Sequence, residues 1–180
     1  MGDIQKHYPV LLIAAVVSRY DDAFDAAREM TSQHWGEIVM ESPRWEFTET
    51  KFYHATMGLD LKKQFFVYRP LIAPNEIAEA KIASNQMEAD YAARAGHPES
   101  RPLNIDPGYI SQAKLVLATT KDRDHRIYLQ QGIFAEVTLY FRSGEWTKSR
   151  WTYPDYQRSD FQDFFSECRK HLRETLRNSQ

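Results

Sequence analysis

The run RIYLQQGIFAEVTLYFRSGEWTKSRW, residues 126–151, predicts the fold most directly, because it alternates apolar and polar side chains between tight turns. Three alternating segments are visible, 126–129, 133–141 and 145–151. Gln130-Gln131-Gly132 fits a three-residue hairpin loop with the glycine in the left-handed conformation, and Ser143-Gly144 fits a two-residue turn. A three-stranded antiparallel meander is therefore expected near the C-terminus.

The two turns also predict which residues of the meander lie opposite one another. Alternation in this register assigns most apolar residues to one core face, while the other face is aromatic but carries an arginine and a glutamate. The expected pairs are Leu129 with Ile133, Ile127 with Ala135, Arg126 with Glu136, and Glu136 with Trp151. The expected core face comprises Ile127, Leu129, Ile133, Ala135, Val137, Leu139 and Phe141.

Helices and further strands are expected on both sides of the meander. The eight apolar residues 10–17 are typical of a strand buried on both faces. Helices are expected over 21–35 and 74–96, and short strands over 38–40, 45–47 and 65–68. The final helix has the clearest period, which places on one face Phe161, Phe164, Phe165, Cys168, Leu172 and Leu176.

The proline-containing stretch 97–109 is interpreted as a structured loop rather than a linker, because it lacks the Ser/Gly or charge bias of one. Asp106-Pro107 resembles an N-cap followed by a first-turn proline, so a helix is expected after it. Its shared face would contain Ile110, Ala113, Leu117 and Thr120. The element order predicts an α/β (α+β) fold with a mixed, mainly antiparallel sheet and helices packed on it, in a single domain over 1–180.

Composition narrows the class of protein. The chain has 180 residues, of which 42% are hydrophobic, enough for a sizeable core. Its net charge of −2 argues against a nucleic-acid partner, although the basic and aromatic strip 146–156 is a weaker alternative. A single cysteine excludes an internal disulfide and fits a reducing compartment. No apolar run is long enough for a membrane span, so a cytoplasmic protein is expected.

Five ordered motifs resemble one known family. They are NIDPGY at 104–109, KLVLATTK at 114–121, HRIYL at 125–129, GIFAEVTL at 132–139 and WTYPDY at 151–156. On these motifs the chain resembles a bacterial domain of unknown function, DUF4416, over nearly its whole length. The resemblance implies a single domain of about this size and no established reaction. Members are sometimes labelled GTP-binding proteins, but the chain has neither a GxxxxGK[ST] phosphate loop nor a GxGxxG fingerprint.

The polar face of the meander and its flanking loops predict a composite pocket. In this hypothesis Arg126 binds an anion, Glu136 serves as a base or accepts ribose hydroxyls, and Trp151 offers a stacking surface. The alternative is that Arg126 and Glu136 form a purely structural cross-strand ion pair. Catalytic residues are not assigned. The candidate ligand-binding residues are Asn104, Asp106, Tyr109, Lys121, His125, Arg126, Glu136, Trp151, Tyr153 and Asp155.

The function expected from this pocket is binding of a small phosphorylated or nucleotide-like ligand, whether or not a reaction follows. The alternative is a non-catalytic domain that docks a protein partner through an aromatic sheet face. The sequence requires no cofactor and no metal, and the histidines lack zinc-ligand spacing. Asp106, Glu136 and Asp155 could together hold Mg²⁺, but their spacing does not demand it. Oligomeric state is left open.

Overall fold

The meander belongs to a large sheet in the structure, a computed structural model that describes residues 2–3 and 7–178. The described residues form nine strands, joined in the order β2-β4-β1-β5-β6-β8-β7, with β3 on β4 and β9 on β8. The strands are β1 (Val10–Ser18), β2 (Ile38–Glu41), β3 (Trp45–Glu46), β4 (Lys62–Ile72), β5 (Asn104–Ile110), β6 (Lys114–Thr119), β7 (Ile127–Gln130), β8 (Ile133–Arg142) and β9 (Glu145–Lys148). The helices are α1 (Asp21–Trp35), α2 (His54–Met57), α3 (Ile77–Ala95) and α4 (Ser159–Asn178), with 3-10 turns at Pro74–Glu76 and Asp155–Gln157.

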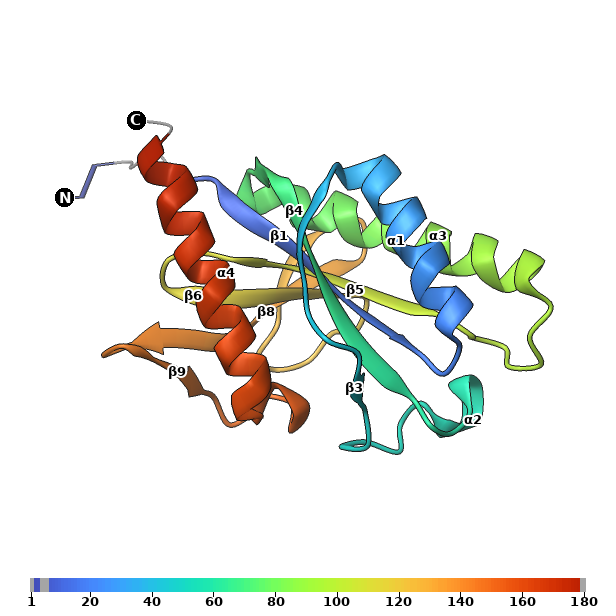
Figure 1. The fold of residues 1–180 in the computed structure, drawn as a ribbon. Coiled ribbons are helices and arrows are strands. Elements are labelled where there is room, and N and C mark those ends of the chain that lie inside the picture. The colour runs from blue at the N-terminus through green and yellow to red at the C-terminus, as the bar shows by residue number, and fades with distance from the viewer. Residues whose placement is uncertain (1, 4–6, 179–180) are drawn as a thin grey trace.

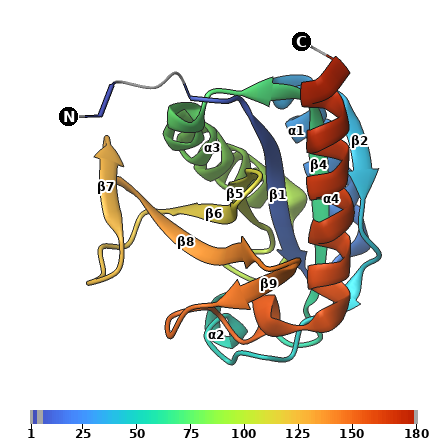
Figure 2. The same ribbon diagram turned by 90° about the vertical axis from the view of Figure 1, so that its left-hand side faces the viewer.

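Helices cover both faces of this antiparallel sheet, which confirms the predicted α+β class (Figures 1 and 2). Strand β1 explains the arrangement, because alternate residues of its apolar run contribute to two cores. Ile13 packs in the core beneath α4, and its neighbour Ala14 packs in the core beneath α1 and α3. The run predicted as a doubly buried strand is therefore confirmed.

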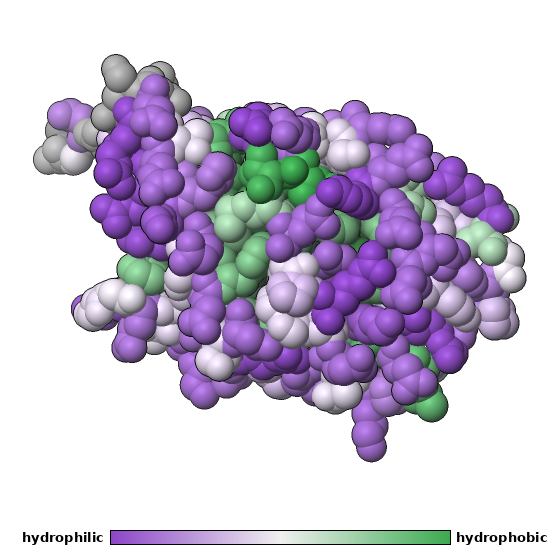
Figure 3. Space-filling view, viewed as in Figure 1, coloured by the Kyte–Doolittle hydropathy of each residue, from purple (hydrophilic) through white to green (hydrophobic). Residues whose placement is uncertain are grey.

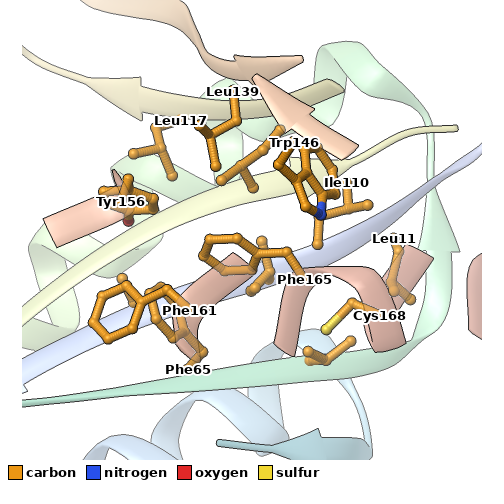
Figure 4. Close-up of a cluster of buried hydrophobic side chains, with 14 of the residues drawn as sticks. Leu11, Phe65, Ile110, Leu117, Leu139, Trp146, Tyr156, Phe161, Phe165 and Cys168 are labelled. Atoms are coloured by element: carbon orange, nitrogen blue, oxygen red, sulfur yellow. The ribbon is translucent and has the colours of Figure 1, made fainter. Parts of the chain in front are cut away.

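Helix α4 supplies the aromatic part of one core, as its period predicts. Phe161, Phe165, Cys168 and Leu172 are fully buried, while Phe164 is half-buried. Figure 4 shows the rings of Phe161 and Phe165 beside Phe65 of β4. The surface on this side is mainly hydrophilic, with an apolar area beside α4 (Figure 3). Within the described residues, no helix is long and apolar enough to cross a membrane.

The predicted loop over 97–109 is correct only for 97–103, and the helix predicted after it is wrong. Residues 104–110 form β5 in the middle of the sheet, and 114–119 form its neighbour β6. The run Leu115–Ala118 is buried throughout, as expected for a short strand covered on both faces. The helical spacing of Ile110, Ala113 and Leu117 is coincidental, and Asp106 is not an N-cap.

Pro107 is tolerated in a central strand because β5 is open on one side at this point. Pairing between β5 and β6 begins only at Gly108. Before it, the free N–H and C=O of Ile105 bind the side chains of Glu88 and Lys81 from α3. The nitrogen of Pro107 points the same way as that of Ile105, where no strand requires a hydrogen bond. This opening between β5 and β6 also borders a cavity.

Gly108 is required by close packing against β6. A Cβ at this position would lie 2.5 Å from the carbonyl oxygen of Val116. We expect Gly108→Ala to lower the free energy of unfolding by about 1–3 kcal/mol, because the two backbones must separate. Urea unfolding followed by tryptophan fluorescence measures this change. Gly2→Ala, where a Cβ meets nothing within 4 Å, is the control, and equal stability of both variants would contradict the packing argument.

The hairpin turns are partly as predicted. Ser143-Gly144 forms the expected two-residue turn, with Arg142 opposite Glu145. The first turn is also a two-residue turn, Gln131-Gly132, which pairs Gln130 with Ile133 and leaves Leu129 as an extra residue. The predicted pair of Leu129 and Ile133 is therefore wrong. The bulge restores the predicted register further along, where Ile127 lies opposite Ala135.

The prediction that the meander has a single core face is also wrong, because β8 contains a bulge of its own. Val137 pairs with Val116 and Leu139 with Leu115, which leaves Thr138 as the extra residue. Ile133 consequently packs on the α3 side of the sheet, and Leu139 packs on the α4 side. Ile127, expected in the core, is 70% exposed on the edge strand β7.

Candidate functional site

A cavity of about 470 Å³ lies where β5, β6 and β8 meet the segments 47–53 and 151–156. Its size is within the range of small-molecule sites. The opening between β5 and β6 lets α3 contribute to its wall through Lys81 and Asn85. The predicted site residues that line it are Asn104, Asp106, Lys121, His125, Arg126, Glu136, Trp151, Tyr153 and Asp155.

Tyr109 is the one predicted site residue that the structure places elsewhere. Asp106 lies opposite Ala15 and Tyr109 lies opposite Leu12, so their side chains point to opposite faces of β5. Tyr109 is buried beside Ile77 in the core on the α3 side. The prediction fails because it treated this segment as a loop, whereas the alternation of a strand separates the two side chains.

Arg126 and Glu136 form the predicted ion pair. The Arg126 Nε lies 2.8 Å from the Glu136 Oε2, and the two side chains are only 5% and 1% exposed. Arg126 precedes β7 rather than lying on it. Its Nη1 donates to the carbonyl of Lys121 at 2.8 Å, and its Nη2 donates to the hydroxyl of Tyr153 at 2.6 Å. Three of the five N–H donors of Arg126 therefore have acceptors, and these bonds hold Glu136, the Lys121 backbone and Tyr153 together at the cavity wall.

Glu136 also holds neighbouring side chains in place. His125 lies with Nε2 3.2 Å from Glu136 and Nδ1 3.0 Å from Asp124. Its ring stacks on Trp151 with centroids 5.2 Å apart, and the Trp151 indole donates to the carbonyl of Val137. Both rings therefore have fixed orientations and form a rigid wall. Trp151 lies outside the third strand, which ends at Lys148, three residues before the predicted end.

A second polar network joins α3 to β5 and was not predicted. The Lys81 Nζ lies 2.9 Å from the Asp106 Oδ1, and Asn104 donates to the Asp106 Oδ2 at 2.7 Å. Arg101 binds Glu88 at 2.7 Å and also Asn104. Burial opposes ionisation of Asp106, but Lys81, Asn104 and Arg101 outweigh it and lower its pKa to about 2. Asp106 is therefore a permanent carboxylate at the cavity wall.

A third pair closes another part of the wall. The Lys63 Nζ lies 2.5 Å from the Asp155 Oδ2, and both side chains are 6% exposed. The same ammonium lies 4.6 Å from the ring centre of Tyr156 and 4.7 Å from that of Phe47. The buried ammonium of Lys63 thus neutralises the carboxylate of Asp155.

Each of the three carboxylates considered as Mg²⁺ ligands therefore forms an ion pair with a cation of its own. Lys81 engages Asp106, Arg126 engages Glu136 and Lys63 engages Asp155. In the part of the chain that the structure describes, no group of three or more His, Cys, Asp or Glu side chains is placed to hold a metal ion.

Cations outnumber carboxylates around this cavity, although the whole chain carries a net charge of −2. The cationic lining residues are Lys63, Lys81, Arg101, Lys121, Arg123 and Arg126, and the acidic ones are Glu49, Asp106, Glu136 and Asp155. Each acid has a cationic partner, which for Glu49 is Arg158. Over residues 2–3 and 7–178, Lys121 and Arg123 form no ion pair with a carboxylate.

Lys121 is partly enclosed by an aromatic ring and by other charges. Its Nζ lies 4.0 Å from the ring centre of Phe52, on the segment opposite. Burial, and then the positive charge of Arg101, lower the pKa of the Lys121 amine, while the charge of Asp106 opposes this. The neighbouring arginine charges that add to this lowering of the pKa, those of Arg101, Arg126 and Arg123, would also favour an anion beside Lys121.

The sequence contained a usable signal for some of the missed lining residues. Lys81 follows Ile77 by four residues and precedes Ser84 by three, so it lies on the apolar face of its helix. Lys63 precedes Phe65 by two residues and shares its strand face. A lysine on a buried face needs a carboxylate partner. The partners themselves were not predictable from local pattern.

Comparison with known proteins supports the resemblance noted in the motifs. The family model for "Domain of unknown function (DUF4416)" matches residues 8–172. No curated protein matches the chain.

Proposed function

This chain belongs to the DUF4416 family, and we propose that it binds a small phosphorylated ligand in the cavity between β5, β6 and β8. The proposal also covers nucleotides, because the cavity has aromatic walls beside its cations. It rests on the loop 119–123, called here the cationic loop.

The cationic loop carries the proposal because it supplies positive charge without a carboxylate partner. Lys121 and Arg123 line the cavity together with Thr119 and Thr120. An ammonium, a guanidinium and hydroxyl groups on one loop are the donors that phosphate oxygens prefer. A phosphate at this position would neutralise the cationic excess of the cavity.

The Arg126–Glu136 pair supports this loop from behind. Through its Nη1, Arg126 holds the carbonyl of Lys121, so the buried ion pair positions the backbone of the cationic loop. We assign the anion-binding role first predicted for Arg126 mainly to Lys121 and Arg123, because Arg126 already pairs with Glu136. A rigid loop with oriented cations loses less conformational entropy on binding than a flexible one.

The concave shape of the site favours ligand binding over partner docking. Asn104 and Asp106 open onto the same cavity as Lys121 and His125, which a composite pocket requires. One observation supports the alternative of partner docking. On the edge strand β7, Ile127 is 70% exposed and Tyr128 is 57% exposed. An exposed edge strand is a surface on which another chain can pair.

The double variant K121A/R123A tests the proposal. We expect inorganic phosphate and ribose 5-phosphate at millimolar concentration to raise the Tm of the unmodified protein, because a ligand of the native state stabilises it. We expect the double variant to bind at least about tenfold more weakly, since hydrogen bonds to charged groups are lost. Thermal shift and titration calorimetry at constant ionic strength measure both effects.

The matched control is K114A/R142A, which removes the same charge from exposed positions that do not line the cavity. It should retain the affinity of the unmodified protein. Equal loss of affinity in both double variants would show that phosphate binding depends only on net charge, which would contradict the proposal. Absence of any Tm shift with phosphate compounds would contradict the proposal and favour docking at β7.

A further inference from the structure

Asp106 is the most accessible carboxylate of the cavity. Its side chain is 31% exposed, compared with 21% for Glu49, 6% for Asp155 and 1% for Glu136. Lys81 binds one oxygen of Asp106 and Asn104 binds the other. A carboxylate oxygen accepts two hydrogen bonds, so each oxygen retains one free position.

The carboxylate of Asp106 is suited to accepting hydrogen bonds rather than to transferring protons. With a pKa of about 2 it is a weak base at neutral pH, and general bases work best near the operating pH. It accepts hydrogen bonds without donating any. Two adjacent hydroxyls, each of which donates one hydrogen bond, complement two adjacent acceptor oxygens.

Two neighbours extend this polar wall. Asn85 lies one helical turn beyond Lys81 on α3 and lines the cavity. Its amide forms no hydrogen bond with any residue of the described ranges, so both its donors and its acceptor are available. Asp106 and Lys121 line the same cavity, so the hydroxyl acceptor and the cationic loop face the same space.

We propose that the phosphorylated ligand carries two neighbouring hydroxyl groups, as in a pentose phosphate or the ribose of a nucleotide, and that Asp106 accepts both of them. This inference rests on the proposed phosphate binding at the cationic loop. The role first predicted for Glu136, acceptance of ribose hydroxyls, is transferred to Asp106, because the Glu136 side chain is only 1% exposed and is surrounded by Arg126, His125 and Thr138.

Removing one hydroxyl from the ligand tests the inference without altering the protein. Titration calorimetry would compare inorganic phosphate, ribose 5-phosphate with 2-deoxyribose 5-phosphate, and adenosine monophosphate with its 2′-deoxy form. We expect at least one hydroxylated compound to bind about tenfold more tightly than its deoxy partner, since a hydrogen bond to a charged group is lost. The pair that shows the difference identifies the source as a free sugar phosphate or a nucleotide.

A protein variant then assigns the effect to Asp106. Asp106→Asn should abolish the preference for the hydroxylated compound while phosphate still binds, and Asp163→Asn, which replaces an exposed acid of α4 outside the lining, should not. Because Asp106 also binds Lys81, Asn85→Ala is the second variant, and it should reduce the preference. Preservation of the preference in Asp106→Asn would overturn the assignment.

The two proposals fail in different ways. If phosphate compounds bind but both deoxy forms bind as tightly as their partners, the inference about hydroxyls is overturned and the phosphate proposal stands. If none of the five compounds binds, the phosphate proposal is overturned and the inference about hydroxyls with it.

Discussion

Replacing Phe165 with alanine is expected to lower the free energy of unfolding by about 3–5 kcal/mol, the usual cost of truncating a buried aromatic ring. Phe165 is 0% exposed on the inner face of α4. Its ring centroid lies 5.0 Å from that of Phe65, 5.9 Å from that of Tyr156 and 6.2 Å from that of Trp146. The cavity left by the ring borders side chains from three separate elements, so the surrounding chain cannot close it by moving one of them.

Urea denaturation measures this loss, and Phe164→Ala is the matched control. Phe164 is the same residue type on the same helix, but it is half-buried, so a smaller loss is expected. A loss below about 1 kcal/mol for Phe165→Ala would show that α4 is peripheral to the core, since a truncation in a close-packed core costs more.

Local periodicity was sufficient to predict the elements that bury one continuous face. Phe161, Phe165 and Leu172 recur at helical spacing, and all three are buried as expected. The apolar run 10–17 likewise becomes the central strand β1. In both cases the local pattern and the tertiary environment favour the same structure.

Strand β5 shows where such reasoning fails. Asp106-Pro107-Gly108 has the composition of a turn or a helix start, and yet it lies inside a central strand. Proline is accommodated because α3 replaces β6 as the hydrogen-bond partner there, and glycine is required because β6 then approaches closely. Both causes lie in residues distant in the chain, so they could not be read from the segment itself.

The ion pairs of the site also differ in how far the sequence could predict them. Arg126 and Glu136 were predicted together because a tight turn joins β8 to β7, which Arg126 directly precedes, and the bulge at Leu129 preserves the register in which Ile127 lies opposite Ala135. Lys63 and Asp155, in contrast, meet across 92 residues of sequence. No turn connects them, so the lysine could be suspected from its strand face but its partner could not be named.

Arg126→Ala is expected to cost about 3–5 kcal/mol of unfolding free energy, because it leaves the carboxylate of Glu136 buried without its cationic partner. The Glu136 side chain is 1% exposed, so water cannot replace the guanidinium. The control is Arg69→Ala. Arg69 and Glu37 also form a close pair, 2.6 Å apart, but their side chains are 65% and 63% exposed. The expected cost there is much smaller, because solvent screens the charges.

The double variant R126M/E136L separates stability from the positioning of the cationic loop. Replacing both charges with apolar side chains removes the buried unpaired carboxylate, so we expect most of the lost stability to return. Phosphate affinity should not return with it, because methionine cannot donate to the carbonyl of Lys121. Chemical denaturation and calorimetry with inorganic phosphate measure the two quantities on the same protein. Full recovery of both would show that the ion pair stabilises the sheet without positioning the loop.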